Sequence, residues 1–179
     1  MAHPLKHFAT ITKHRHKVIK YCAKAGILLQ GLRHDLSKYS PSEFVNGARY
    51  YVGTKSPNTA ERKIKGYSQA WLHHKGRNKH HFEYWTDYNP VYHKVMPVKM
   101  PLRFVIEMFC DRVAAGAVYK GEDYTQAYPL EYFENGREHR FIHPETSALL
   151  EKLLVMLAEK GEDETFSYIK NNLRKQKDY

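Results

Sequence analysis

The segment Leu102–Tyr119, LRFVIEMFCDRVAAGAVY, decides the fold class. Its apolar residues recur at intervals of three and four, with Val105, Phe109 and Val113 on one side, and this spacing predicts a helix packed against a core. Asp111 lies inside the same apolar pattern. A buried ionised carboxylate is costly unless a cation or a metal compensates its charge. The segment therefore predicts both a core helix and a candidate ligand.

Helical spacing continues over most of the chain. Helices are predicted at residues 5–26, 41–53, 59–74, 102–119, 144–160 and 162–179. Ser40, Pro41 and Glu43 predict the start of the second helix, with Ser40 as N-cap and Glu43 closing a capping box. Residues 86–100 contain prolines and are predicted to be irregular, and no strand is predicted. We expect an all-α single domain over residues 1–179, with a core of about 5–160 and an appended C-terminal helix at 161–179.

The composition favours a cytoplasmic protein with an anionic partner. Lysine and arginine number 29 against 19 aspartates and glutamates, a net charge of +10. This charge favours a nucleotide, a nucleic acid or a phosphorylated metabolite as partner. No run of 18 apolar residues predicts a membrane span, and the N-terminal residues lack the apolar region of a signal peptide. Cys22 and Cys110 are isolated in apolar patterns and are expected to be reduced core residues.

The stretch His34-Asp35-Leu36-Ser37-Lys38 carries the clearest chemistry. His34 and Asp35 offer one imidazole nitrogen and one carboxylate oxygen, and both can reach the same cation where the backbone turns at a helix end. Lys38 follows Asp35 by about one helical turn. Its ammonium group could hold a phosphate oxygen beside a metal. Because a His-Asp dipeptide is common, the prediction depends on further ligands elsewhere in the chain.

The twelve histidines of the chain can supply such ligands. His14 shares the apolar face of the first predicted helix and is expected to point inward. Residues 73–81, HHKGRNKHH, hold four imidazoles in nine positions. His74 is preferred over His73 because it lies one turn beyond the preceding apolar stripe. The pattern does not distinguish His80 from His81.

Carboxylates and one amide add to this set. Asp111 points at or near the core, and a salt bridge to an arginine or lysine is the alternative to a metal. Glu107 lies one turn earlier on nearly the same face and could orient a ligand or bind a water molecule. Glu43 and Asn78 are reserve candidates for contacts behind the ligands, although structural roles as cap and turn are favoured for them.

In chain order these residues form the pattern H…HD…H…H…D, which resembles the HD-domain superfamily of metal-dependent phosphohydrolases, proteins with an all-α fold. The run HDLSK also resembles the HDIGK-type signature of the subgroup that hydrolyses cyclic dinucleotides. The GYP tripeptide of that subgroup is absent, so its substrate class is not implied. More closely, the phrases HDLSKYSPSEF, AWLHHKGRNKHHFEYW and EMFCDR resemble a small bacterial and phage family of unassigned function over residues 10–160.

The resemblance implies an HD-domain-like helical bundle and a phosphohydrolase acting on a nucleotide or another phosphate ester. It implies one or two divalent ions, with Mn, Fe, Ni, Co, Mg and Zn as candidates. Asp35 would bridge two metals or bind one, and Lys38 and Arg77 would contact the phosphate. The first metal site would use His14, His34, Asp35 and Asp111. The second would add His74 with His80 or His81.

Two alternatives belong to other functional classes. The same ligands could hold two irons and activate oxygen, as a minority of the HD superfamily does. Alternatively, the site is not catalytic, and the basic surface binds nucleic acid or a protein partner in a salt-sensitive manner. The sequence alone leaves the substrate, the metal and the oligomeric state open.

Overall fold

A computed structural model describes residues 2–179, and most of these residues are helical. The expectation of a mainly helical fold is confirmed, whereas an HD-like bundle stays a prediction. Among the described residues, no helix is both long and apolar enough to cross a bilayer. The helices are α1 (Pro4–Lys24), α2 (Leu28–Arg33), α3 (Pro41–Arg49), α4 (Pro57–Lys65), α5 (Gln69–Lys75), α6 (Leu102–Tyr119), α7 (Tyr128–Glu134) and α8 (Pro144–Asn171).

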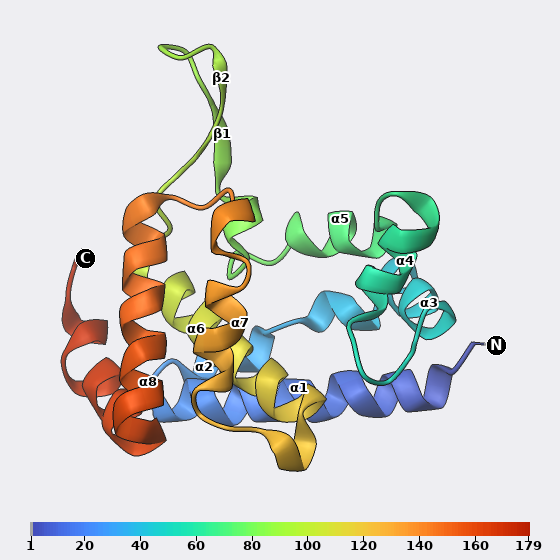
Figure 1. Ribbon diagram of the computed structural model, residues 1–179, viewed down its shortest axis with the longest axis horizontal. Helices are drawn as coiled ribbons and strands as arrows, with labels where there is room; N and C mark the ends of the chain where they lie inside the picture. The colour runs from blue at the N-terminus through green and yellow to red at the C-terminus, as the bar shows by residue number, and fades with distance from the viewer. Residues whose placement is uncertain (1) are drawn as a thin grey trace.

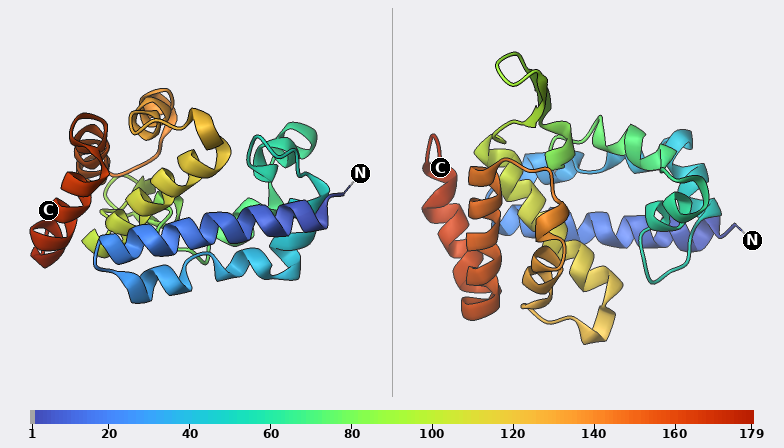
Figure 2. Two further views of the ribbon diagram at one scale, coloured as in Figure 1. Left: turned by 90° about the horizontal axis from the view of Figure 1, so that it is seen from below. Right: turned by 45° about the horizontal axis from the view of Figure 1, so that its top comes forward.

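Helix α1 runs along most of the length of the molecule, and the other helices are arranged around it (Figures 1 and 2). Helices α3, α4 and α5 lie toward its N-terminal half, while α6, α7 and α8 lie toward its C-terminal half (Figure 1). Helix α1 packs directly against α2, α3 and α6. In the C-terminal half, α1 and α6 both pack against α8 as well as against each other, so these three helices surround one core.

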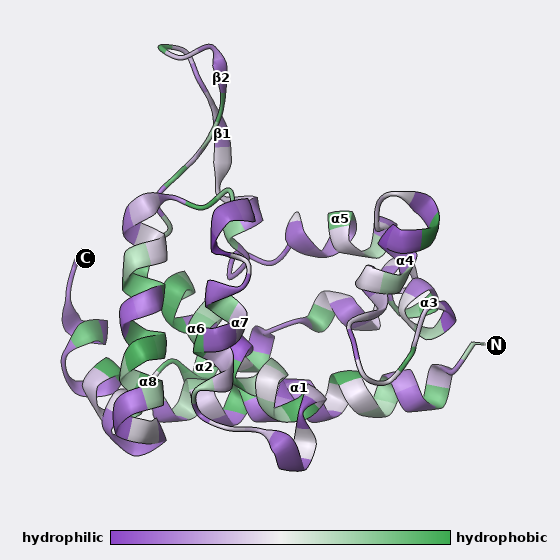
Figure 3. Ribbon diagram, in the orientation of Figure 1, coloured by the Kyte–Doolittle hydropathy of each residue, from purple (hydrophilic) through white to green (hydrophobic). Residues whose placement is uncertain are grey.

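The hydrophobic core lies in the half built by α1, α6 and α8. Val105 and Phe109 of α6 are fully buried, as their spacing predicts, and Leu153 of α8 belongs to the same cluster. Figure 3 shows the apolar residues gathered on α6 and along α8. Cys22 and Cys110 are free thiols buried in this core, in agreement with the prediction.

The C-terminal segment continues from α8 after a local break. Gly161 has φ of 82° and ψ of 175°, which interrupts the helix, so the predicted separation at this glycine is found. Positive φ is a conformation that glycine adopts readily. Beyond it, Phe166, Ile169 and Leu173 are buried in the same core as α6. The segment expected as an appended helix therefore contributes to the core.

The prediction that the chain contains no strand is wrong in one segment. Strands β1 (Thr86–Asn89) and β2 (Lys94–Pro97) pair as an antiparallel hairpin, with Thr86 opposite Pro97. The hairpin projects away from the helices (Figure 1). The prolines of this segment predict an irregular chain. In the structure, however, Pro97 is the last residue of β2 and Pro90 lies in the turn between the strands. A missing N–H does little harm at these positions.

The helix predicted at residues 59–74 is also incorrect, because two helices occupy this region. Helix α4 ends at Gly66, which has φ of 81°. Ser68 then caps α5, and its Oγ accepts a hydrogen bond from Trp71 N at 3.1 Å. The apolar spacing runs across this break and therefore hides it. The helix predicted at residues 41–53 likewise ends early, at Arg49.

Gly31 allows α2 to lie directly against α1. A Cβ atom at this position would lie only 2.5 Å from Cys22 Cβ. Helix α2 leads into His34 and Asp35. The close approach at Gly31 therefore sets the distance of these two residues from α1.

We expect Gly31→Ala to lower the free energy of unfolding by about 1–3 kcal/mol, because the added methyl group overlaps Cys22 and pushes α2 away from α1. Leu29→Ala on the same helix is the control, since the Leu29 side chain is exposed. Its effect should stay within about 0.5 kcal/mol. Chemical denaturation measures both values, and a Gly31→Ala protein as stable as the parent would contradict this account.

Candidate metal centre

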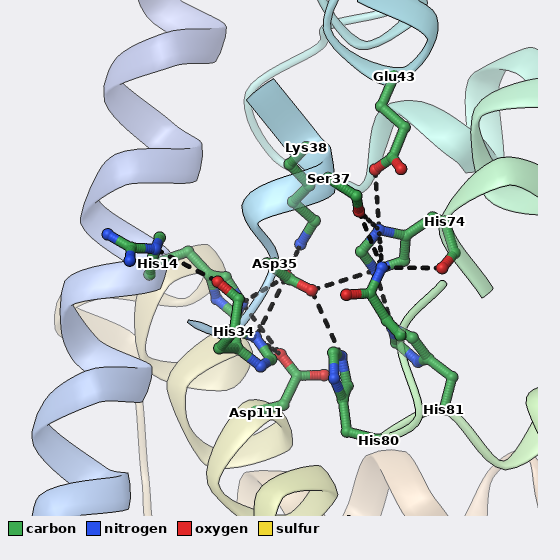
Figure 4. A network of polar contacts seen from close by, with 12 residues as sticks. His14, His34, Asp35, Ser37, Lys38, Glu43, His74, His80, His81 and Asp111 are labelled. Carbon is green, nitrogen blue, oxygen red and sulfur yellow. Dashed lines mark hydrogen bonds and ion pairs between the residues drawn. The ribbon is translucent and has the colours of Figure 1, made fainter. Parts of the chain in front are cut away.

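The backbone turns sharply between α2 and α3, at His34 and Asp35. Asp35 has φ of 54° and ψ of 25°, the left-handed conformation. This conformation costs an L-residue about 1–2 kcal/mol, although aspartate adopts it more often than most. The short 3₁₀ helix η1 (Leu36–Tyr39) follows, and Lys38 N donates to Asp35 O at 3.0 Å. The turn directs the side chains of His34 and Asp35 into one buried space (Figure 4).

The first group of candidate ligands joins α1, this turn and α6. Its donor atoms all lie within 4.8 Å of one another. His14 Nε2 is 3.0 Å from Asp111 Oδ1, and His34 Nε2 is 3.2 Å from Asp35 Oδ2. The packing of α1 against α6 thus brings together residues that are far apart in the chain. The group consists of His14, His34, Asp35 and Asp111.

The second group joins Asp35 to the end of α5 and the turn that follows it. Asp35 Oδ1 lies 3.3 Å from His74 Nε2 and 3.4 Å from His80 Nε2. His81 Nε2 lies 2.9 Å from His74 Nε2, so both His80 and His81 enter the group. Asp35 belongs to both groups, with Oδ2 toward the first and Oδ1 toward the second (Figure 4).

Two further carboxylates lie behind the imidazoles. Glu107 Oε1 accepts a hydrogen bond from His34 Nδ1 at 2.9 Å and lies 3.2 Å from His80 Nδ1. Glu43 Oε2 accepts a hydrogen bond from His74 Nδ1 at 2.8 Å. A carboxylate bound at Nδ1 fixes the tautomer and leaves the Nε2 lone pair facing the centre. The histidine ligands of metal sites are commonly held in this way.

The position of Glu43 shows that the predicted capping box is wrong. Within residues 2–179, the Ser40 side chain bonds to no helix backbone group, and its hydroxyl lies 3.0 Å from Ser42 Oγ. Glu43 instead accepts hydrogen bonds from His73 Nδ1, at 2.6 Å, and from His74. The Glu43 carboxylate is therefore bound by imidazole N–H groups and not by the backbone N–H group that a capping box requires. Glu43 therefore lies behind the candidate ligand His74, the role for which the sequence makes it a reserve candidate.

Asn78 and Gln30 complete the surroundings of the two groups. Asn78 Nδ2 donates to Ser37 Oγ and to His74 O, both at 2.8 Å, which ties η1 to the end of α5. Gln30 Nε2 donates to Glu107 Oε2. Gln30 is absent from the predicted residues, and its one signal in the sequence is a polar side chain within the apolar run ILLQGL.

The donor atoms that face one another are better suited to binding a metal ion than to hydrogen bonding among themselves. In the part of the chain that the structure describes, His34 Nε2, His80 Nε2 and Asp35 Oδ1 are buried without a hydrogen-bond partner. Such atoms are rare because they are costly. Ligands about 2.1 Å from one metal and at right angles lie about 3 Å apart, close to the shortest distances found. The mixture of imidazole and carboxylate suits Mn, Fe, Co, Ni or Zn, so these buried His/Asp clusters could hold a metal ion.

The charge states of several donors fit this chemistry. Burial raises the pKa of Asp35 and of Asp111, but nearby imidazoles and, for Asp35, Lys38 lower both pKa values well below the usual range. Burial lowers the pKa of His14 and of His81. The two carboxylates are therefore ionised and the two imidazoles neutral, which are the forms that bind metals.

His34 and His74 differ from the other imidazoles. Burial lowers the pKa of each, but Asp35 raises both pKa values further, to above the usual value. In the metal-free protein these two histidines hold their protons more strongly than a free imidazole does. A metal must displace those protons, so its affinity should rise with pH.

Lys38 lies beside the candidate ligands, whereas Arg77 does not. Lys38 Nζ is 2.5 Å from Asp35 Oδ2, and the Lys38 side chain remains 30% exposed. Arg77 is exposed and donates to His73 O at 3.4 Å. The structure thus gathers the predicted metal ligands and Lys38, but leaves Arg77 outside. The predicted ligands that it gathers are His14, His34, Asp35, His74, His80, His81 and Asp111.

Glu107→Gln tests the carboxylate behind His34 and His80. Burial raises the pKa of Glu107, but hydrogen bonds from the two imidazoles lower it to about 2, below the usual 4.5. The ionised carboxylate therefore stabilises the fold above pH 4.5, and this contribution is lost as the pH falls from 4.5 toward 2. We expect Glu107→Gln to lower the free energy of unfolding of the metal-free protein by about 2–3 kcal/mol at pH 7, and by less in acid.

Denaturant unfolding across this pH range measures the difference between parent and variant. Glu134→Gln is the control, because Glu134 is exposed on α7. A stability difference that stays constant down to pH 3 would show that Glu107 does not act through its charge.

Comparison with known proteins gives one match. The model of a family of unknown function, DUF5662, matches residues 3–156. Searches of curated proteins and of solved structures found no match. The match agrees with the predicted resemblance to a family of unassigned function, and the relation to the HD-domain superfamily stays a prediction. Because the family model covers most of the chain, this protein belongs to the DUF5662 family.

Proposed function

We propose that this protein is a metal-dependent phosphohydrolase acting on a nucleotide or another phosphate ester. The observation that carries the proposal is the buried carboxylate of Asp35, whose two oxygens face two groups of imidazole and carboxylate donors. The order of these donors along the chain adds the resemblance to HD-domain phosphohydrolases. A single metal ligand or a basic surface would not by itself support a proposal of phosphate ester hydrolysis.

The two donor groups would hold one or two divalent ions, with Asp35 shared between them. Six imidazole and carboxylate side chains besides Asp35 favour Mn, Fe, Co, Ni or Zn over Mg, which prefers oxygen ligands. A bound divalent ion supplies a water molecule of lowered pKa and a positive charge beside the phosphoryl oxygens.

Lys38 supports the proposal as the contact for the phosphate group. Its ammonium group lies beside Asp35 and its side chain is partly exposed, so it can contact both the centre and a ligand from solvent. Burial lowers the pKa of Lys38, but Asp35 and Asp111 raise it further, so the group stays charged. A lysine ammonium binds phosphate oxygens as a point charge. The net charge of +10 favours the approach of such anions.

Metal analysis of the protein purified without chelator is the decisive experiment. We expect near-stoichiometric metal in the parent and none in Asp35→Ala, which lacks the shared carboxylate. Asp87→Ala is the matched control, because Asp87 is exposed on β1. Added metal should also raise the melting temperature of the parent, since it binds the native state. Equal metal contents in the parent and in Asp35→Ala would contradict the proposed site.

The identity of the metal separates the proposal from its alternatives. Manganese, nickel or cobalt directs the next assay to nucleotides and phosphate esters. Iron directs it to oxygen consumption, because the same His/carboxylate donors suit two irons. If the protein takes up no metal even after metal is added, this result favours the alternative in which the protein is a basic module that binds nucleic acid or a protein.

We expect Lys38→Met to lower kcat for a phosphate ester by about 100-fold, the loss typical of removing one group that stabilises transition-state charge. Lys63→Met is the control, because Lys63 is exposed on α4. Hydrolysis rates and metal contents of the three proteins are measured together. Unchanged hydrolysis by Lys38→Met with a full metal content would exclude Lys38 from the phosphate site.

A further inference from the structure

The segment that supplies the histidines of the second donor group is also strongly basic. Residues 55–85 contain seven lysines and arginines against two glutamates, so they carry half of the net charge of +10. Of the seven cations, only Lys65 forms an ion pair in the described part of the chain, and its partner is the buried Glu61. Glu83 is the one other anion of the segment, and a single carboxylate does not offset the remaining cations.

Two of these cations lie over aromatic rings. Arg62 Cζ is 5.4 Å from the centre of the Trp71 ring, and Lys79 Nζ is 5.7 Å from the centre of the Tyr84 ring. Arg62 and Lys79 are exposed, Trp71 is partly exposed, and Tyr84 is 37% exposed. Each pair therefore offers a cation and an aromatic ring at the surface of the protein.

Both pairs are in contact with the candidate ligand His81, which is itself partly exposed. The centres of the Trp71 and His81 rings are 4.7 Å apart, with the rings edge to face. Tyr84 N donates a hydrogen bond to His81 O at 3.1 Å. His81 Nε2 in turn lies beside His74 Nε2 in the second donor group (Figure 4). Printed contacts thus join the two cation–aromatic pairs to the candidate metal centre.

A cation beside an aromatic ring matches the two parts of a nucleotide. A guanidinium or ammonium group binds a phosphate oxygen, and a ring stacks on a base. This combination is typical of proteins that bind single strands, whose bases are free to stack on side chains. Two such pairs in contact with one candidate ligand fit consecutive nucleotides of a strand better than they fit a single nucleotide.

We propose that Arg62, Trp71, Lys79 and Tyr84 bind single-stranded nucleic acid, and that a phosphodiester of this strand is the substrate of the metal centre. The second part rests on the proposed phosphohydrolase function. Hydrolysis would form a bond between the oxygen of water and the phosphorus, and it would break one P–O ester bond. One product then carries the phosphate and the other a hydroxyl group, and each product receives one of the two protons of the water.

The first arm of the test measures the binding of a fluorescently labelled oligothymidine to the metal-free protein by fluorescence anisotropy. We expect Arg62→Gln/Lys79→Gln to bind it at least about tenfold more weakly, because charge-assisted contacts to phosphates are lost. The slope of log Kd against log salt concentration should also fall by about 0.7 for each lost contact. Lys13→Gln/Lys20→Gln removes the same charge from exposed positions on α1 and should bind as the parent does.

Tyr84→Leu tests stacking without a change of charge. We expect it to weaken the binding of the oligothymidine at least about fivefold, the lower end of the loss for one stacked base, with an unchanged salt slope. Tyr132→Leu is the control, because Tyr132 is 61% exposed on α7. An unlabelled duplex of the same length should compete poorly, since its bases are not free to stack on a side chain.

The second arm uses the metal-loaded protein. We expect the ratio of kcat/KM for the oligothymidine to kcat/KM for a small phosphodiester without bases to fall at least about tenfold in Arg62→Gln/Lys79→Gln. The α1 double variant should keep the ratio of the parent. All variants should melt close to the parent, because the substituted side chains are exposed.

Two binding results would overturn the inference. One is equal oligothymidine affinity in Arg62→Gln/Lys79→Gln and the α1 double variant. The other is a duplex that competes as well as the single strand, because phosphate contacts alone would then explain the binding. A parent that hydrolyses small phosphate esters but binds no oligothymidine would also overturn it and leave the proposed function standing.

The opposite combination separates the two proposals in the other direction. Oligothymidine binding that depends on Arg62, Lys79 and Tyr84, in a protein that hydrolyses no phosphate ester, would support the strand-binding surface. That result would count against the hydrolase proposal alone.

Discussion

The arrangement of this protein depends on the burial of one charged carboxylate. Asp35 is 1% exposed, and an ionised carboxylate removed from water requires compensation from every side. Each element that reaches it supplies part of that compensation: α1 provides His14, α5 provides His74, and η1 returns Lys38 to it. The left-handed backbone at Asp35 is tolerated because this conformation brings the carboxylate to the centre of these groups.

The apolar core and the candidate metal centre are separate regions of the fold. The core cluster draws on α1, α6, α7 and α8, and among the described residues none between 41 and 75 belongs to it. Helices α3 and α5 are instead joined by the hydrogen bond between Glu43 and His74, and Asn78 joins the end of α5 to η1 through its hydrogen bonds to His74 and Ser37. The two halves of the molecule therefore meet at the donor groups, and a metal ion there would connect them.

The sequence predicts the ligands best where helical spacing determines which side chains face inward, as for His14 and Asp111. It does not separate His80 from His81, because these residues lie in a turn and periodicity carries no information about turn geometry. The structure places both near His74. Glu43 shows a different limit of prediction from sequence. A glutamate at this helix position fits a capping box and also fits a contact to two imidazoles, so the sequence does not distinguish these two roles. Strand pairing at residues 86–97 depends on contacts between segments, which a proline-rich stretch does not reveal.

Two local costs meet at the same centre: the left-handed backbone at Asp35 and the buried donor atoms without hydrogen-bond partners among the described residues. Glycine at position 35 would remove the first cost, and apolar residues at the donor positions would remove the second, so stability of the fold does not explain them. Such departures from local rules are expected where a chain is shaped for a ligand. All of these residues lie within the segment that matches the family model, residues 3–156. The site that bears these costs is therefore the part of the chain where the function of this family should be sought.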